Sequence, residues 1–188
     1  MRFATLAVPP EATAVQVSLI LTVIGPDRPG LVETLAQLVS SHGGNWLESR
    51  MAHLEGQFAG LLRVLVPQDS VAALREALLE LDAQEIRILL SESHGVPIPS
   101  PDRRVALEVV GQDRPGIVRE IAAALAAQGV NVEEFDSHCT SAPMSGETLF
   151  NARAELRVPE SATLEEVRAT LERIGNELMV DVSLEPTS

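Results

Sequence analysis

One segment of this chain occurs twice, and the duplication limits the possible folds more than any other feature. Gly25-Pro26-Asp27-Arg28-Pro29-Gly30 returns 86 positions later as Gly111-Gln112-Asp113-Arg114-Pro115-Gly116. Helically spaced apolar residues follow both copies: Leu31, Leu35, Leu38 and Val39 correspond to Ile117, Ile121, Ala124 and Leu125. Further on, Val71 and Leu74 match Leu164 and Val167 at an offset of 93, so the second copy has gained seven residues, mainly around 140–147. The sequence predicts one fold used twice.

Each copy begins with the same predicted elements. An alternating strand, residues 15–23 or 105–109, leads through the Gly/Pro turn into an amphipathic helix at 29–42 or 115–128. Gly43 and Gly129 are the expected helix stops.

The remaining elements also correspond between the copies. Two strands pair as a hairpin, 45–54 with 57–66 and 131–140 with 147–158. The second helices are expected to begin at the N-caps Ser70 and Thr163, with Glu166 completing a capping box, and to close near Asp82 and Gly175. The last strands are predicted at 85–92 and 178–185.

The order βαββαβ, twice over, predicts an α+β protein made of two ferredoxin-like units. Each unit has an antiparallel four-stranded sheet with both helices on one face. The expected division is a loose tail at 1–14, a first domain at 15–92, a Pro-rich linker at 93–102 and a second domain at 103–188. Because the other sheet face is left bare, we expect the units to pack against each other or a second chain, through sheet edges or helices, which favours a homodimer.

Composition excludes several classes of function. The 188 residues carry a formal net charge of -13, and aromatic residues make up 3%, so phosphate-backbone binding and base stacking are not expected. The single cysteine, Cys139, allows no internal disulfide and favours a reducing compartment, with cytoplasm as the default. The longest apolar run, 17–24, is far shorter than the roughly 20 residues of a membrane-spanning helix, so we predict no membrane contact.

The repeated turn joins the end of a strand to the start of a helix, where unpaired N–H groups favour a carboxylate or another anion. Gly30 and Gly116 permit close approach of a ligand to the backbone. The alternative is an ordinary turn, in which Asp27 and Asp113 cap the helices and Arg28 and Arg114 lie in solvent.

A family resemblance rests on these residues. Gly-Pro-Asp-Arg-Pro-Gly-Leu-Val, followed about fourteen residues later by Gly-Gly-Asn, resembles the start of an ACT domain, a βαββαβ module that senses small molecules; the second copy, with Gly-Val-Asn, resembles it too. Residues 48–54 before Gly56-Gln57-Phe58 are similar to the corresponding segment of tandem-ACT repressors of the glycine cleavage system. Trp46 and the longer second hairpin depart from the family pattern.

The resemblance implies a ligand site at a domain interface, formed by the first strand-helix loop and the residue that opens the second strand. It nominates ten residues here: Asp27, Arg28, Gly30, Leu31, Asn45, Asp113, Arg114, Gly116, Ile117 and Asn131. The implied ligand is a small amino acid, possibly glycine. The implied role is non-enzymatic regulation of transcription by contact with an activator protein, without direct contact to nucleic acid.

Two other functions stay open, a regulatory subunit of an amino-acid metabolic enzyme and a structural dimerisation module without ligand. Catalysis within the chain is not expected, because the two modules account for its whole length and His138 and Cys139, as neighbours on a strand, point to opposite faces. The histidines show no metal-ligand spacing, so we predict no metal and no cofactor.

Overall fold

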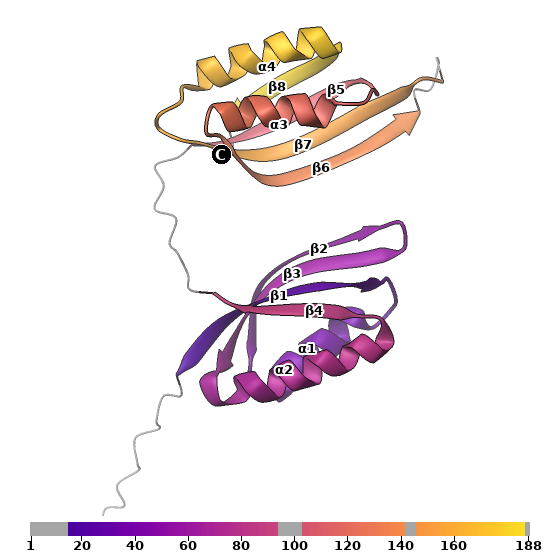
Figure 1. Cartoon of the computed structure of the whole chain (residues 1–188), viewed down its shortest axis with the longest axis vertical. Helices are drawn as coiled ribbons and strands as arrows, with labels where there is room; N and C mark the ends of the chain where they lie inside the picture. The colour runs from indigo at the N-terminus through magenta and orange to yellow at the C-terminus, as the bar shows by residue number, and fades with distance from the viewer. Residues whose placement is uncertain (1–14, 94–102, 142–145, 187–188) are drawn as a thin grey trace, which may run out of the picture. The chain divides into compact units, whose positions relative to one another are not determined.

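The structure is a computed structural model that describes residues 15–93, 103–141 and 146–186 (Figure 1). The predicted tail at 1–14, nearly all of the predicted linker, the central part of the second hairpin loop and residues 187–188 lie outside the described residues. Contacts between residues divide the chain into two compact units, 1–97 and 98–188.

The two units contain the same succession of strands and α-helices, and the first also has two short 3-10 helices, η1 and η2. The first unit comprises β1 (Gln16–Pro26), α1 (Leu31–Ser41), β2 (Asn45–Leu54), β3 (Gln57–Pro67), η1 (Gln68–Ser70), α2 (Val71–Leu79), η2 (Glu80–Gln84) and β4 (Arg87–Glu92). The second comprises β5 (Arg103–Gln112), α3 (Ile117–Ala127), β6 (Asn131–Ser141), β7 (Thr148–Val158), α4 (Leu164–Leu178) and β8 (Val180–Pro186).

The sheets have equivalent topology. Their strand orders are β2-β3-β1-β4 and β6-β7-β5-β8, and the paired strands run antiparallel. The predicted fold class, two ferredoxin-like βαββαβ units with four-stranded sheets and two helices each, is confirmed. In both sheets β2 or β6 forms one edge, and β4 or β8 forms the other.

The two hairpins explain most of the extra length of the second unit. The β2–β3 ladder closes at Leu54 opposite Gln57, whereas the β6–β7 ladder closes at Ser141 opposite Thr148. The inserted residues therefore fall between β6 and β7, at the place that the change of sequence offset indicated.

The sequence placed some helix ends incorrectly. Helices α1 and α3 begin at Leu31 and Ile117, so the prolines of both turns lie before the helices and not in their first turn. Helix α4 does not close near Gly175 but continues to Leu178, where Met179 adopts a left-handed φ of 56° and ends it.

The two expected N-caps differ. Ser70 precedes α2 but forms no side-chain cap, because η1 already turns the chain into the helix. Thr163 and Glu166 form the predicted capping box of α4.

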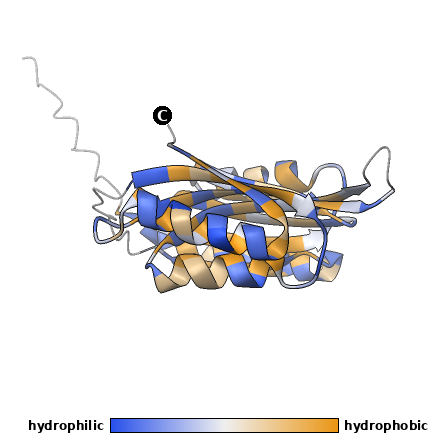
Figure 2. Ribbon diagram, turned by 90° about the horizontal axis from the view of Figure 1, so that it is seen from above, coloured by the Kyte–Doolittle hydropathy of each residue, from blue (hydrophilic) through white to orange (hydrophobic). Residues whose placement is uncertain are grey.

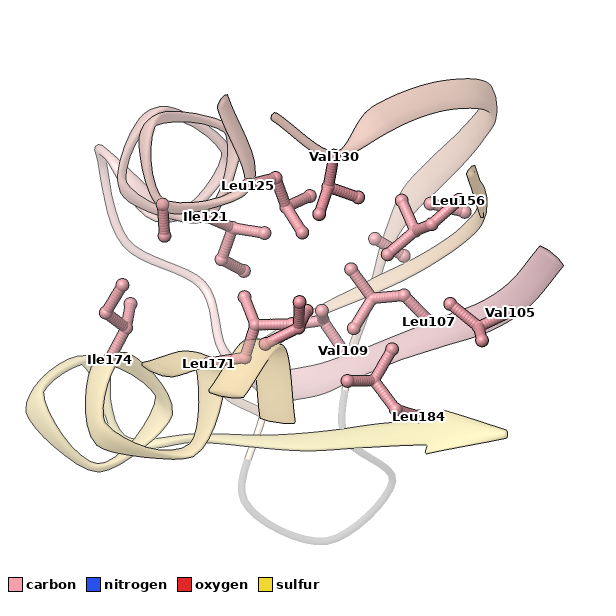
Figure 3. Close-up of a cluster of buried hydrophobic side chains, with 14 of the residues drawn as sticks. Val105, Leu107, Val109, Ile121, Leu125, Val130, Leu156, Leu171, Ile174 and Leu184 are labelled. Atoms are coloured by element: carbon pink, nitrogen blue, oxygen red, sulfur yellow. The ribbon is translucent and has the colours of Figure 1, made fainter. Parts of the chain in front are cut away.

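Each unit has its own hydrophobic core between the sheet and the helices. In β1 the residues that face the helices, Leu19, Leu21 and Val23, are completely buried, while their neighbours along the strand are more exposed. Figure 2 shows that the helices carry both hydrophobic and hydrophilic residues, as expected of helices with one face on a core. Figure 3 shows the second core, where Leu107 and Val109 of β5 meet Leu125 of α3 and Leu171 of α4.

Candidate functional site

The repeated turns bring each chain into its first helix through a glycine in the left-handed region. Gly30 has φ 90° and Gly116 has φ 102°, and each occupies the N-cap position of its helix. Neither helix start receives a side-chain cap. Asp27 and Asp113 are therefore not caps, which removes the structural role that the alternative reading of the turn gave them.

The first-turn N–H groups of these helices are available to a ligand. Thr34 and Glu120 donate their backbone N–H to Gly30 and Gly116, at 2.9 and 3.0 Å, so the regular helical bonding begins there. Before these residues, the N–H groups of Val32 and Val118 have no acceptor within the described ranges. Unpaired N–H groups at a helix start attract anions such as carboxylates.

The aspartates of the turns are anchored through their backbones. The N–H of Asp27 donates to the Gly56 carbonyl at 2.9 Å, and that of Asp113 donates to the Thr148 carbonyl at 2.8 Å. Gly56 lies in the β2–β3 connection and Thr148 opens β7, so each turn is held against a hairpin. Both aspartate side chains are exposed.

The two arginines of the turns lie in different environments. Arg28 donates to Oε1 of Gln84 at 2.8 Å and is thereby tied to the segment before β4. Arg114 is half-buried and makes no hydrogen bond or ion pair within the part of the chain that the structure describes. Of the two guanidinium groups, that of Arg28 is the one with a side-chain partner within the described residues.

The first glycine of each turn has a packing role instead. A Cβ atom on Gly25 would lie 3.0 Å from the Glu85 carbonyl oxygen, and one on Gly111 would lie 2.7 Å from Cα of Val180. These glycines let the edge strands β4 and β8 approach, so they belong to the fold and not to the site.

The structure does not bring the ten predicted site residues together within a unit. Asn45 lies opposite Leu65, which pairs with Ser18, whereas the turn follows Pro26 at the other end of β1. At about 3.3 Å per residue, these ends are about 26 Å apart. Asn131 is separated from Asp113 in the same way, because it lies opposite Arg157 and hence beside Arg104.

No single unit therefore brings both groups of predicted site residues together. One group consists of the turn residues, which are Asp27, Arg28, Gly30 and Leu31 in the first unit and their equivalents Asp113, Arg114, Gly116 and Ile117 in the second. The other group consists of the strand-opening residues Asn45 and Asn131. The topology of a single sheet was the signal that could have shown this separation, since β1 and β2 of such a unit run in parallel directions with α1 between them.

A cavity of about 220 Å³ lies between α3, β6 and the sheet of the second unit. Its lining is entirely apolar and includes Val118 and Val132, the neighbours of two predicted site residues, with Phe135 of β6 and Ala154 of β7. Phe135 is 46% exposed, so apolar surface reaches the solvent here.

A comparison of the halves explains the cavity, which sequence reasoning missed. At the positions of Val132 and Ser137 the first unit has Trp46 and Met51, and both of these pack against its core. Ala154 replaces Leu62 in the same region. The second unit is thus emptier where the first is filled, and the substitution of Trp46 by Val132 was the available signal.

No other chemistry stands out in the described ranges. His138 pairs with Asn151 on the helix-free face, and Cys139 pairs with Phe150 on the other, as adjacent strand residues must. No group of three or more potential metal-ligating side chains converges within these ranges. None of the described helices is long and apolar enough to cross a membrane.

Comparisons with known proteins agree with the duplicated architecture. ACT-domain models match residues 18–91 and 102–176. The chain is 26% identical over 168 residues to the glycine cleavage system transcriptional repressor of Escherichia coli (strain K12), with 88% of both proteins covered, and it matches the Shigella flexneri repressor equally. A crystal structure of an unknown protein from Galdieria sulphuraria has a TM-score of 0.80 and 31% identity, covering 93% of this chain and all of that one. This homology supports a regulatory role, and the chain belongs to the ACT-domain family, with two ACT domains in tandem.

Proposed function

We propose that this protein is a non-enzymatic regulator that binds a small amino acid, with glycine as the first candidate, between two ACT units. It passes the signal on by contact with another protein, a transcription activator, rather than by contact with DNA. The proposal places the protein in the cytoplasm as a homodimer. The repressor relatives support transcription as the process, and the net charge of -13 argues against direct binding to nucleic acid.

The observation that carries the ligand site is the uncapped helix start that occurs in both units. In each, a left-handed glycine opens the helix, no side chain caps it, and a first-turn N–H group lacks an acceptor within the described ranges. These N–H groups suit the carboxylate of an amino acid. An amide oxygen, as in Asn45 or Asn131, suits its ammonium group.

Edge pairing explains how the two groups could meet. Strands β2 and β6 are edge strands of 10 and 11 residues, and long bare edges expose rows of unpaired N–H and C=O groups. If two such edges pair antiparallel about a two-fold axis, the end of one unit that carries the turn comes beside the end of the other that carries the asparagine. The sites would then lie at the interface between units.

The signal requires that the ligand bind one arrangement of units better than another. A ligand with equal affinity for both arrangements would shift nothing, while a tenfold preference is worth about 1.4 kcal/mol. In this proposal each site is shared by two units, so binding of the ligand also fixes the position of one unit relative to the other.

Isothermal titration of the full chain with glycine, serine and a panel of other amino acids tests the proposal. We expect binding of at least one of them, weakened at least tenfold by Asp27→Ala or Asn45→Ala while the fold is retained, because both side chains are exposed at element ends. Asn176→Ala, on the exposed surface of α4, is the control and should bind as the unaltered chain does.

Two results would contradict this account. Absence of binding at millimolar concentrations would leave a structural module without ligand. A collapse of thermal stability in Asp27→Ala or Asn45→Ala would show that these residues hold the fold and not a ligand.

A further inference from the structure

We propose that the helix-free sheet face of the first unit packs against the same face of a second copy of the chain. This inference rests on the homodimer in the proposed function and names its surface, but it does not depend on the amino acid. The edge pairing proposed for the ligand site joins units side by side, whereas the apolar face would join two copies of the chain face to face.

The surface, called here the apolar face, is fixed by the strand register. Leu19, Leu21 and Val23 point to the helices, so Ile20, Thr22 and Ile24 point to the other side of the sheet. Their cross-strand partners complete the apolar face. These are Ala59, Leu61 and Arg63 of β3, and Arg87, Leu89 and Ser91 of β4.

The apolar face carries exposed hydrophobic side chains on three neighbouring strands. The exposed fractions are 50% for Ile24, 51% for Leu61 and 71% for Leu89. Thr22 lies between Leu61 and Leu89 on the neighbouring strands, so these side chains form one continuous row across three strands. A contiguous apolar patch of this kind on a soluble protein is typical of an interaction surface.

The equivalent face of the second unit has the opposite character. Glu108 corresponds to Thr22, and its partners Arg153 and Ser183 correspond to Leu61 and Leu89. Arg153 forms an ion pair with Glu108 at 2.7 Å, in the place of the apolar row. Asp136 pairs with Arg153 on the next strand, where the first unit has Arg50.

The difference between the two helix-free faces indicates which surface covers the apolar face. Covering the apolar face with the charged face would bury Glu108 and Arg153 against Leu61 and Leu89, and desolvation of such charges costs several kcal/mol. A second copy of the apolar face carries no such penalty at its centre. Of the two helix-free sheet faces described, it is the one with matching chemistry.

Charged side chains border the hydrophobic row of the apolar face. Arg87 lies two residues before Leu89 on β4, Arg63 lies two residues after Leu61 on β3 and forms an ion pair with Glu48 at 3.5 Å, and Arg50 of β2 lies opposite Leu61. A hydrophobic patch bordered by polar and charged side chains is the usual anatomy of a protein interface. A two-fold axis places the same patch on both partners, which gives a closed dimer and not a filament.

The flat area of the sheet approaches the area that each partner buries in a stable dimer. Four strands spaced ~4.8 Å apart and up to 11 residues long present roughly 600 Å² before side-chain relief is added. A standard interface buries about 800 Å² per partner. Two such faces would stack about 10 Å apart as in a β-sandwich, with the helices of each unit outside.

Sedimentation equilibrium of the full chain tests the inference, with Leu61→Lys and Leu89→Lys, singly and together, as variants. We expect a dimer for the unaltered chain and at least a tenfold weaker association for the double variant. Both residues are exposed, so circular dichroism should show an unchanged fold. The matched control is Ser183→Lys, which places the same charge at the corresponding position of the second unit and should leave the dimer intact.

The outcomes separate this inference from the proposed function. A dimer that survives the double variant, or one that Ser183→Lys disrupts, would place the contact elsewhere and overturn the inference while the homodimer stands. A monomeric unaltered chain at about 100 µM, well above a Kd of about 1 µM, would overturn both the face and the homodimer. Titration of the double variant with the amino-acid panel then tests ligand binding by itself.

Discussion

At the scale of single residues, Gly30 and Gly116 have the clearest role, because their φ angles of 90° and 102° admit no ordinary side chain without strain. Around Gly30 there is open space, since an added Cβ would meet nothing within 4 Å. Any cost of substitution at Gly30 is therefore a backbone cost. The resemblance of the turn to ACT domains indicated the residue, and the structure supplies the reason.

We predict that Gly30→Ala destabilises the first unit by about 1 to 2 kcal/mol, the usual cost of a left-handed conformation for an L-residue. Gly30→Asn should cost clearly less, because asparagine tolerates this region. Urea denaturation followed by the fluorescence of Trp46, the single tryptophan, reports this unit directly. Equal losses for Ala and Asn would show that the position is not limited by its backbone angle.

Trp46 and Val132 show how the same position can be filled or left empty. Trp46 packs against the first core, whereas Val132 borders the cavity of about 220 Å³ in the second. We predict that Trp46→Val costs about 2 kcal/mol, as large-to-small substitutions at packed sites do. Val132→Trp should cost less than 1 kcal/mol, because the space to receive the ring is present.

Thermal unfolding followed by circular dichroism checks this pair of substitutions. A loss of stability in Val132→Trp as large as that in Trp46→Val would mean that the cavity cannot accept a ring. The cavity would then not be the counterpart of the tryptophan site.

At the scale of elements, the capping box of α4 is the described feature with a clear pH dependence. Oε2 of Glu166 accepts hydrogen bonds from the hydroxyl of Thr163 at 2.8 Å and from its backbone N–H at 3.1 Å. These bonds, the hydroxyl bond first, lower the pKa of Glu166 below its usual value. The ionised carboxylate therefore contributes to folding above the unfolded pKa of about 4.3.

We predict that this contribution is present at neutral pH and is lost as the pH falls through the lowered pKa of Glu166. Glu166→Gln should therefore reduce the stability of the second unit at pH 7 and have a smaller effect near pH 3. Hydrogen exchange of the first-turn amides of α4, measured for both chains across this pH range, gives the comparison. A difference between the chains that did not depend on pH would contradict the role of the carboxylate.

Much of the element pattern follows from the sequence because both periodicities are strong in it. The alternation in β1 and the helical spacing from Leu31 predict the elements, and Gly43 and Gly129 adopt the positive φ values expected where α1 and α3 stop. Helix ends are less predictable. Gly175 read as a stop, but it is a buried position where Cβ would lie 2.8 Å from the Val180 carbonyl oxygen, so its small size serves packing within the helix.

The residues of the candidate site could be predicted from the sequence, but their arrangement in space could not. The repeated turn nominated Asp27 and Arg28, yet the position of Asn45 about 26 Å away follows from strand direction and register rather than from spacing in sequence. The apolar face could not be predicted from the sequence either. Its contrast with the charged face of the second unit appears only when Leu61 and Arg153 are matched through their ladders.

At the scale of the whole molecule, the duplication has produced two units with one topology and different surfaces. The first unit has a filled helix-side groove at Trp46 and an apolar helix-free face, whereas the second has an open cavity and a charged face. The first unit is thus suited to association between copies. In the second unit the guanidinium of Arg114 has no partner among the described residues, so we expect the stronger contact with a ligand there.

The central claim is that an amino acid binds at the duplicated helix starts, and a nuclear magnetic resonance titration of the backbone amides tests it most directly. On addition of the amino acid that binds in calorimetry, or of glycine if none does, we predict that the amide signals of Val32, Glu33, Val118 and Arg119 shift first and most. The signals of Asn45 and Asn131 should move at the same ligand concentration, since the proposed site joins both groups. Amide shifts confined to other parts of the chain, or no shifts at millimolar amino acid, would contradict the account.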